Sequence, residues 1–411
     1  MAEARFVEAG PELDALAPAW AALPARWPDN PLFLHPAWLR AWQLQFAQHA
    51  TSGVMAVEAD GRLTGVMPVM YARVRRGPTM MPRYDYLPGD EAFLSVRPRY
   101  RLIPVRQLSP VLGLACTNVR GGLAAASADR AACIAAILYR FADKSGFDIA
   151  LFPLPHSDLP AWQRGLKATG LAALFHPKVR SLYARSSLMT WDAYLQERGR
   201  HYRKRAKQSE RYIAEAGLRL EIAEGQPAVQ EGLEALARCA SLSWKVVGRE
   251  GEPCIVPYTR KQRAFVEALC RADPVDVIPL FCHLRDSDGV VRAVMLSFLC
   301  RRTLVPFLTF YDPEIARLGP GRFMIKGLFD FSNGDGAGRF DTIDFNATHP
   351  WVERFVEHVE TYHHLLVFAP GPYGFVLRQL ARRAGAVPPS QMDTIAADEP
   401  LRLPENAEGW A

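Results

Sequence analysis

The sequence lacks the features that mark several large classes of protein. Its seven cysteines are an odd number, are scattered along the chain and form no C-x-x-C pair, which argues against a disulfide framework and a thiolate zinc site. No apolar run approaches the length of a membrane-spanning helix. The first residues also lack the basic and then apolar shape of a secretion signal, so we expect a cytoplasmic protein.

What the chain does contain is the composition of an ordinary globular protein. Hydrophobic residues make up 49% and charged residues 22% of the 411 residues, and this length exceeds what one core usually supports. Short apolar runs alternate with helix patterns through residues 1–180, and the same order of elements returns after Trp191. We therefore predict an α/β (α+β) protein with two similar domains in tandem, residues 1–180 and 181–388, and a flexible tail over 389–411.

One segment of the second half is typical of a site for a phosphate-bearing ligand. An apolar run over 304–311 predicts a strand, and a helix pattern over 323–331 follows a loop that contains Gly319 and Gly321. Glycine lets the backbone approach a ligand closely, and the free N–H groups at a helix N-terminus favour an anion. The alternating segment 339–345 predicts a strand that returns beside the first, which completes a unit suited to a nucleotide-tailed cofactor.

The loop that contains Gly319 and Gly321 has other interpretations besides a phosphate site. The loop lacks the Gly-Lys-Ser/Thr ending of a nucleoside triphosphate loop, and it is too short for the three-glycine dinucleotide fingerprint. Two glycines one residue apart also occur in ordinary turns, so a plain helix entry stays an alternative. Arg317 and Arg322 stand where their guanidinium groups could pair with an anion.

The order of these pieces resembles the acetyltransferase-like proteins named for cellulose-biosynthesis genes (CelD-like), which are double-domain members of the GNAT superfamily related to the FemAB peptidyltransferases. The strand, the Tyr-Asp-Pro that begins at Tyr311, the Leu-Gly-Pro-Gly loop and the Asp-Thr-Ile-Asp-Phe of 341–345 carry the resemblance. Ala316 departs from it, because the GNAT loop usually has Arg or Gln there. Further pieces occur in the expected order at Phe33–Trp42, Gly65–Pro68, Tyr202–Arg211, Ser243–Lys245 and Arg292–Met295.

The resemblance implies a fold, a co-substrate and a reaction. It implies two GNAT-like domains, each with a mixed central sheet flanked by helices, and an acyl-CoA site without a metal in the C-terminal domain. The N-terminal domain would hold the acceptor and a degenerate cofactor site. The reaction implied is N-acyl transfer to an amine, and amino-lipid acyltransferases such as bacterial ceramide synthases favour a long-chain sphingoid acceptor. The cofactor contacts that we expect are Phe310, Arg317, Gly319, Gly321, Arg322 and Lys326.

For catalysis the sequence offers three side chains close to this unit. A thioester is already activated, so transfer to an amine needs positioning, removal of a proton and stabilisation of an oxyanion. We expect His349 to act as the base, oriented by Asp344, because an unperturbed histidine titrates near neutral pH. We expect Tyr311 to protonate the leaving thiolate. A histidine packed on Trp351 and a plain strand-end turn at Tyr311 are the alternatives.

Positive charge is concentrated in two stretches. The formal net charge is +6, and the helix pattern over 192–215 contains seven Arg or Lys from Arg198 to Arg211 against the single acid Glu210. The alternatives for this stretch are a solvated helix face, contact with the phosphates of CoA, an anionic membrane surface and tRNA. The second stretch, 73–106, suits either a buried domain interface or docking on a membrane, which would place the protein at the periphery of the inner membrane.

Two other functions compete with acyl-CoA-dependent transfer. A FemAB-like enzyme would take its acyl group from aminoacyl-tRNA, and the basic stretch 198–211 would serve it. A non-catalytic scaffold in envelope polysaccharide or lipid biosynthesis would keep the fold without the phosphate site, and the presence of Gly319 and Gly321 argues against that. The pair His363-His364 lacks the i, i+4 spacing of a helical ligand pair, so we expect no metal.

Overall fold

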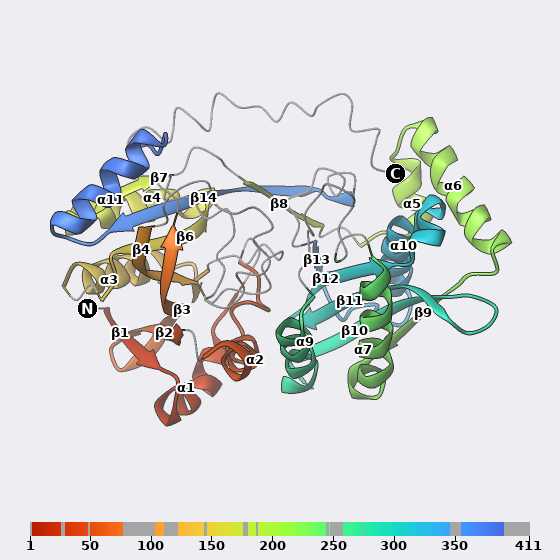
Figure 1. The fold of residues 1–411 in the computed structure, drawn as a ribbon, viewed down its shortest axis with the longest axis horizontal. Coiled ribbons are helices and arrows are strands. Elements are labelled where there is room, and N and C mark those ends of the chain that lie inside the picture. The colour runs from red at the N-terminus through yellow and green to blue at the C-terminus, as the bar shows by residue number, and fades with distance from the viewer. Residues whose placement is uncertain are drawn as a thin grey trace. The chain divides into compact units, whose positions relative to one another are not determined.

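The chain forms two compact units. A computed structural model describes residues 2–25, 29–47, 50–76, 103–110, 122–143, 146–175, 180–185, 188–243, 246, 258–273, 275–345 and 355–389 (Figure 1). Unit 1 comprises the described residues up to Leu182 together with those from Glu360 onward, and unit 2 comprises those of Tyr183–Val359. Among the helices that the structure describes, none has both the length and the apolar character needed to cross a bilayer.

Unit 1 is built on a mixed sheet with the strand order β1-β2-β3-β4-β6-β14, in which β5 also pairs with β3 and β7 with β14. Its strands are β1 (Glu3–Glu8), β2 (Ala50–Ala59), β3 (Arg62–Arg76), β4 (Ile103–Pro110), β5 (Ala124–Ala125), β6 (Ile149–Pro155), β7 (Ala172–Phe175) and β14 (His358–Phe368). Its helices are α1 (Pro11–Ala22), α2 (Pro36–Phe46), α3 (Arg130–Asp143), α4 (Leu159–Thr169) and α11 (Pro372–Arg383), with the 3-10 turn η3 (His156–Asp158) before α4.

The core of unit 1 lies between this sheet and α3 with α4. Ile134, Ile137 and Phe141 recur at helical spacing on α3 and are almost completely buried. They pack with Phe152 of β6 and Trp162 of α4 in one cluster. The apolar face of α3 therefore packs into this core.

Unit 2 is built on a second mixed sheet with the strand order β8-β13-β12-β11-β10-β9. Its strands are β8 (Arg180–Arg185), β9 (Arg219–Glu224), β10 (Val277–Arg285), β11 (Val291–Cys300), β12 (Thr303–Tyr311) and β13 (Thr342–Asp344). Its helices are α5 (Trp191–Gln196), α6 (Arg200–Glu215), α7 (Gly225–Leu242), α9 (Arg260–Ala272) and α10 (Pro320–Asn333), with the 3-10 turn η4 (Pro313–Leu318) before α10.

Helices cover both faces of the sheet in unit 2. Leu280 and Cys282 on β10 belong to the core cluster that α5, α6 and α10 complete. Side chains alternate along a strand, so the intervening Phe281 points to the other face. There it meets Gly232 of α7, where an added Cβ would lie 2.4 Å from the Phe281 ring. Glycine at this position therefore sets how closely α7 approaches the sheet.

The two units share one order of elements. In each, a first strand and a helical segment precede three antiparallel strands, which are followed by a helix and by a strand parallel to the third of them. The helix is α3 between the parallel strands β4 and β6 in unit 1, and α10 between β12 and β13 in unit 2. The expected fold class, two tandem α/β domains with mixed sheets flanked by helices, is confirmed.

The division of the chain differs from the expected one at its second boundary. The sequence pattern placed residues up to 388 in the second domain, whereas the chain returns to unit 1 from Glu360 onward. The reason is pairing, because β14 is antiparallel to both β6 and β7 of unit 1. The predicted tail over 389–411 lies outside the described residues except for Pro389, whose carbonyl accepts from the Gln163 amide at 3.0 Å.

Candidate cofactor site

The connection from β12 to α10 contains the loop for which the sequence predicts a phosphate-bearing ligand. After β12 the Asp312 carboxylate accepts from the Glu314 N–H at 2.9 Å and begins η4. Gly319 ends η4 and precedes α10 with φ +71°, a left-handed conformation that glycine adopts without strain. An added Cβ at Gly319 would also lie 3.1 Å from the Ser209 hydroxyl. The glycine thus lets the chain pass directly from η4 into the helix.

The N-terminus of α10 leaves one backbone N–H available among the described residues. Pro320 at the first helical position has no N–H, and the N–H groups of Arg322 and Phe323 bond to the Gly319 carbonyl at 3.1 and 3.3 Å. The N–H of Gly321 meets no acceptor within the described residues. A Cβ added to Gly321 would have nothing within 4 Å, so its outer side is open. A helix end of this kind favours an anion.

Two arginines beside this helix end have no carboxylate partner in the described parts of the chain. Arg317 is exposed, and Arg322 is half-buried with its guanidinium 5.7 Å from the centre of the Tyr202 ring. Arg292, by contrast, is 3.2 Å from Asp312 and also contacts Glu314. Arg317 and Arg322 are therefore the cations that an incoming anion would meet.

Lys326, which we expected to contact the cofactor, is engaged within α10. Its ammonium pairs with Asp330 one turn further on and lies 5.8 Å from the centre of the Phe323 ring. This ion pair directs the lysine along the helix surface towards the C-terminal end, away from the first turn.

Helix α6 holds the loop in place from the side. The Ser209 hydroxyl donates to the Leu318 carbonyl, and Tyr202 lies under Arg322. The acid Glu210 accepts from the Trp191 indole at 2.8 Å. The exposed cations of α6 that find no carboxylate among the described residues are Arg200, Lys204, Arg205 and Lys207.

A pocket of about 580 Å³ lies beside the loop in unit 2. Its walls come from the end of α6, the turn between β10 and β11, and η4. Arg317 and Leu318 connect it to the start of α10. The complete lining is Tyr212, Ala216, Leu218, Asp286, Arg292, Glu314, Ile315, Arg317 and Leu318.

The edge of β12 that faces β13 has few pairing partners among the described residues. The two parallel strands pair only at Thr303 with Thr342 and at Leu304 with Ile343 within the described residues. Beyond them β12 continues to Tyr311, and a bulge relative to β11 leaves Phe307 as an extra residue. Backbone amide and carbonyl groups on such an edge can pair with an extended ligand.

The structure separates two of the predicted catalytic residues. Asp344 is completely buried on β13, where it pairs with Ala184 of β8, and the register places it at the level of Val305. Tyr311, at the far end of β12, is therefore about 20 Å further along the strand at about 3.3 Å per residue. One reacting atom cannot touch both side chains. His349, the predicted base, lies outside the described residues.

Phe310 and Tyr311 point to opposite faces of the sheet. Tyr311 packs against the core cluster on the α10 side. Phe310 is completely buried, and its ring centre lies 5.3 Å from that of Tyr258, which precedes α9. The side chain of Phe310 is therefore a core residue, and only its backbone borders the open edge of β12.

In unit 1 protein carboxylates occupy the corresponding helix end. Arg130, the first residue of α3, lies 2.7 Å from Asp29 and 2.5 Å from Asp158, and all three side chains are largely buried. Burial raises the pKa of Asp29 to about 6, against the opposing attraction of Arg130. Sequence reasoning missed this cluster because its members are far apart in the chain and each is unremarkable by itself.

A second cluster that sequence reasoning missed lies at the end of β6 in unit 1. The Nε2 atom of His363 on β14 is 3.0 Å from Nδ1 of His156, and His363 is completely buried. Burial, with the nearby His156, lowers the pKa of His363 to about 4. The Glu360 carboxylate accepts from the Ser157 N–H at 3.1 Å, and burial raises its pKa. The His363 imidazole is therefore neutral at neutral pH.

Comparison with known proteins places unit 2 in a known class. Residues 200–361 match the family described as an acetyltransferase (GNAT) domain. The match covers the loop, α10 and both parallel strands. This part of unit 2 therefore matches a GNAT-type acetyltransferase domain. No curated protein matches the sequence.

Three solved structures align with most of the chain. The crystal structure of FemX is 12% identical with a TM-score of 0.52, over 87% of this chain and 96% of that chain. L-PGS from Bacillus licheniformis is 12% identical with a TM-score of 0.46, over 85% and 96%. A tandem GNAT protein from the clavulanic acid biosynthesis pathway is 11% identical with a TM-score of 0.44, over 90% and 100%. The likeness to FemX is a likeness of fold.

Proposed function

We propose that the chain transfers the acyl group of an acyl-CoA to the amine of a long-chain amino lipid. The observation that carries the proposal is the N-terminus of α10. It combines an open Gly321, an N–H without an acceptor in the described structure, and the unneutralised cations Arg317 and Arg322. These groups suit the pyrophosphate of CoA, which carries negative charge and accepts hydrogen bonds.

The edge of β12, which is unpaired beyond Leu304 among the described residues, supports the same substrate. An extended arm with amide groups, such as the pantetheine of CoA, can pair with backbone groups between Val305 and Tyr311. The bulge at Phe307 lies midway along this edge, where a backbone donor can face a developing oxyanion. We assign base catalysis to His349. Asp344 would act through that histidine, whereas Tyr311 stands at the end where the pyrophosphate would bind.

The lipid acceptor follows from the resemblance of the sequence to acyltransferases of amino lipids. A second candidate function is transfer from aminoacyl-tRNA. The fold likeness to FemX and the exposed cations of α6 favour it, because a row of unpaired cations attracts a polyanion. A non-catalytic scaffold would need neither Gly321 nor the two free arginines.

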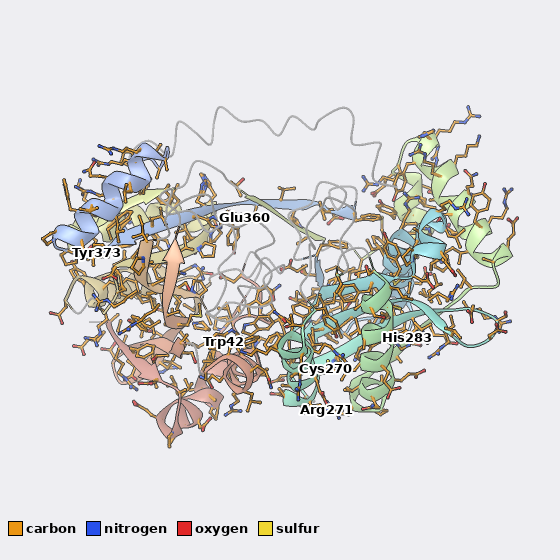
Figure 2. The ribbon with its side chains drawn as sticks, in the orientation of Figure 1. Trp42, Cys270, Arg271, His283, Glu360 and Tyr373 are labelled. Atoms are coloured by element: carbon orange, nitrogen blue, oxygen red, sulfur yellow. The ribbon has the colours of Figure 1, made fainter. Side chains whose placement is uncertain are left out.

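The proposal can be tested by identifying the ligand that the protein retains. The full chain is incubated with a mixed pool of acyl-CoA thioesters, desalted and examined by native mass spectrometry. We expect the mass of an acyl-CoA to be retained, and we expect Arg317→Gln with Arg322→Gln to abolish retention. Arg271→Gln on α9, labelled in Figure 2, is the control because it removes a charge distant in sequence from the loop. In a parallel incubation that also contains aminoacyl-tRNA, retention of tRNA in place of any thioester would favour the second candidate.

A further inference from the structure

Helix α11 presents apolar side chains outward although its other face is packed. Gly374, Leu377 and Ala381 are its buried residues and recur at the spacing of one helix face. On the outer side Phe375 is 55% and Val376 is 50% exposed. Single exposed apolar side chains are common on protein surfaces. Phe375 and Val376, however, are adjacent on one turn and together form a small exposed apolar patch.

The first turn of α11 is fixed on unit 1. A Cβ added to Gly374 would lie 2.0 Å from the Ala369 carbonyl oxygen, so the helix sits directly against the chain before it. The Tyr373 hydroxyl donates to the Pro104 carbonyl of β4 at 2.5 Å. Figure 2 labels Tyr373 on this helix. The exposure of Phe375 and Val376 is therefore a property of a well-anchored helix.

The charge of α11 has one sign. The helix contains three arginines and neither aspartate nor glutamate. The Arg378 guanidinium lies 5.5 Å from the centre of the Phe375 ring, while Arg382 and Arg383 are exposed in the last turn. None of the three forms an ion pair within the part of the chain that the structure describes. The surface thus begins with apolar side chains and ends with unneutralised cations.

We propose that this surface of α11, made of Tyr373, Phe375, Val376, Arg378, Arg382 and Arg383, docks the chain on an anionic lipid surface. An apolar turn can enter the boundary of the acyl chains while arginines beside it contact lipid phosphates. The helix is about 18 Å long at 1.5 Å per residue, so one end can enter while the other stays among the head groups. The contact is peripheral, and it does not depend on the function proposed above.

Two other occupants fit the surface less well. A second copy of the chain, joined through the same helix about a twofold axis, would bring six arginines and no carboxylate from the two helices to the shared surface. A nucleic acid would pair with the cations but would leave Phe375 and Val376 in contact with water. Helix α6 shows the contrast, because its apolar residues Ala206 and Ile213 are buried and its exposed side chains are mainly charged or polar. A lipid surface would contact both the apolar side chains and the arginines of α11.

The test is sedimentation of the full chain with vesicles. We expect binding to vesicles of phosphatidylcholine mixed with phosphatidylglycerol, and much weaker binding to phosphatidylcholine alone. Phe375→Ser with Val376→Ser should weaken binding to the mixed vesicles tenfold or more. Arg382→Gln with Arg383→Gln should do the same and remove the preference for phosphatidylglycerol. All four side chains are exposed, so the unfolding midpoint should not change.

Matched controls make the outcome decisive. Leu44→Ser removes an apolar side chain that is 74% exposed on α2, and Arg164→Gln with Lys167→Gln removes two exposed charges from α4. Both controls should bind the mixed vesicles as the wild type does. Equal loss in the controls, or normal binding by the serine pair, would overturn the proposal. A change of oligomeric mass in the serine pair without a change in vesicle binding would overturn it as well, in favour of a second copy.

Discussion

At the scale of single residues, the two glycines of the loop have different roles. Gly319 serves the turn, since its φ of +71° is unfavourable for other residues. Gly321 lies in the first turn of α10 with nothing near a Cβ, so the fold does not require glycine there. We infer that Gly321 leaves room for a ligand.

Alanine at each position separates these roles. Gly321→Ala should keep or raise the free energy of unfolding, by up to about 1 kcal/mol from helix propensity, yet lower CoA affinity severalfold. Gly319→Ala should instead cost about 1 kcal/mol or more of stability. Urea unfolding and calorimetric titration measure both quantities. If Gly321→Ala binds CoA normally, no ligand passes over that position.

The proposed base also belongs to this scale. His349→Ala should lower the turnover number by roughly 100-fold or more while acyl-CoA binding is unchanged, because general-base catalysis contributes about 10²–10⁴. The acidic limb of the pH–rate profile should flatten in the same variant. Steady-state kinetics over a pH series is the measurement. Near-normal turnover with an unaltered profile would show that His349 is not the base.

His363 predicts a particular dependence of stability on pH. Its pKa is about 4 in the folded protein and 6.5 in an ordinary environment, so its contribution to stability is complete above pH 6.5 and is lost as the pH falls towards 4. Relative to His363→Gln, the wild type should therefore lose roughly 3 kcal/mol between pH 7 and pH 4. Urea unfolding at several pH values measures this. The exposed His358 gives the control His358→Gln, and parallel curves for wild type and His363→Gln would contradict the prediction.

At the scale of elements, most strands and helices of unit 2 were predictable from periodicity. The strand at 304–311 and the helix after the loop are present, although α10 begins at Pro320 because proline suits the first helical position. The single helix expected over 192–215 is two helices, α5 and α6, with Gly199 in an extended conformation before the second. Charge and spacing alone do not reveal that break.

Helix α6 carries a prediction about polyanions. Lys204, Arg205 and Lys207 are exposed without a carboxylate partner in the described structure, so changing all three to Gln should weaken binding of tRNA and reduce its salt dependence. The logarithmic slope should fall by about 2–3, while the melting temperature barely moves. Filter binding over a range of salt concentrations measures the slope. Arg211→Gln, whose side chain pairs with Glu215, should show a smaller effect. If the triple variant and the wild type have equal slopes, these cations do not bind tRNA and form only a solvated helix face.

At the scale of the whole molecule, the tandem arrangement was predictable but its closing strand was not. The sequence of an apolar strand such as β14 does not indicate which sheet the strand joins. Only its pairing with β6 and β7 assigns it to unit 1. The conformation of the loop before α10 could be predicted because glycine and proline act locally. The Arg130 cluster and the histidine pair could not, because distant segments form them.

The difference between the two units also predicts how many acyl-CoA molecules one chain binds. In unit 2 the end of α10 is open and bordered by free cations, whereas in unit 1 Asp29 and Asp158 already neutralise Arg130 at the end of α3. A pyrophosphate at α3 would meet carboxylates in a buried site, which is strongly unfavourable. We therefore expect one acyl-CoA per chain, bound by unit 2.

Calorimetric titration of the full chain with CoA tests this account most directly, with the wild type compared to Arg322→Glu. The variant places a carboxylate beside the proposed pyrophosphate and removes a charge-assisted contact, which together should cost on the order of 2–4 kcal/mol. We predict a stoichiometry of one for the wild type and an affinity lower by tenfold or more for the folded variant. Unchanged affinity in Arg322→Glu, or two equivalent sites in the wild type, would contradict a single CoA site at the start of α10.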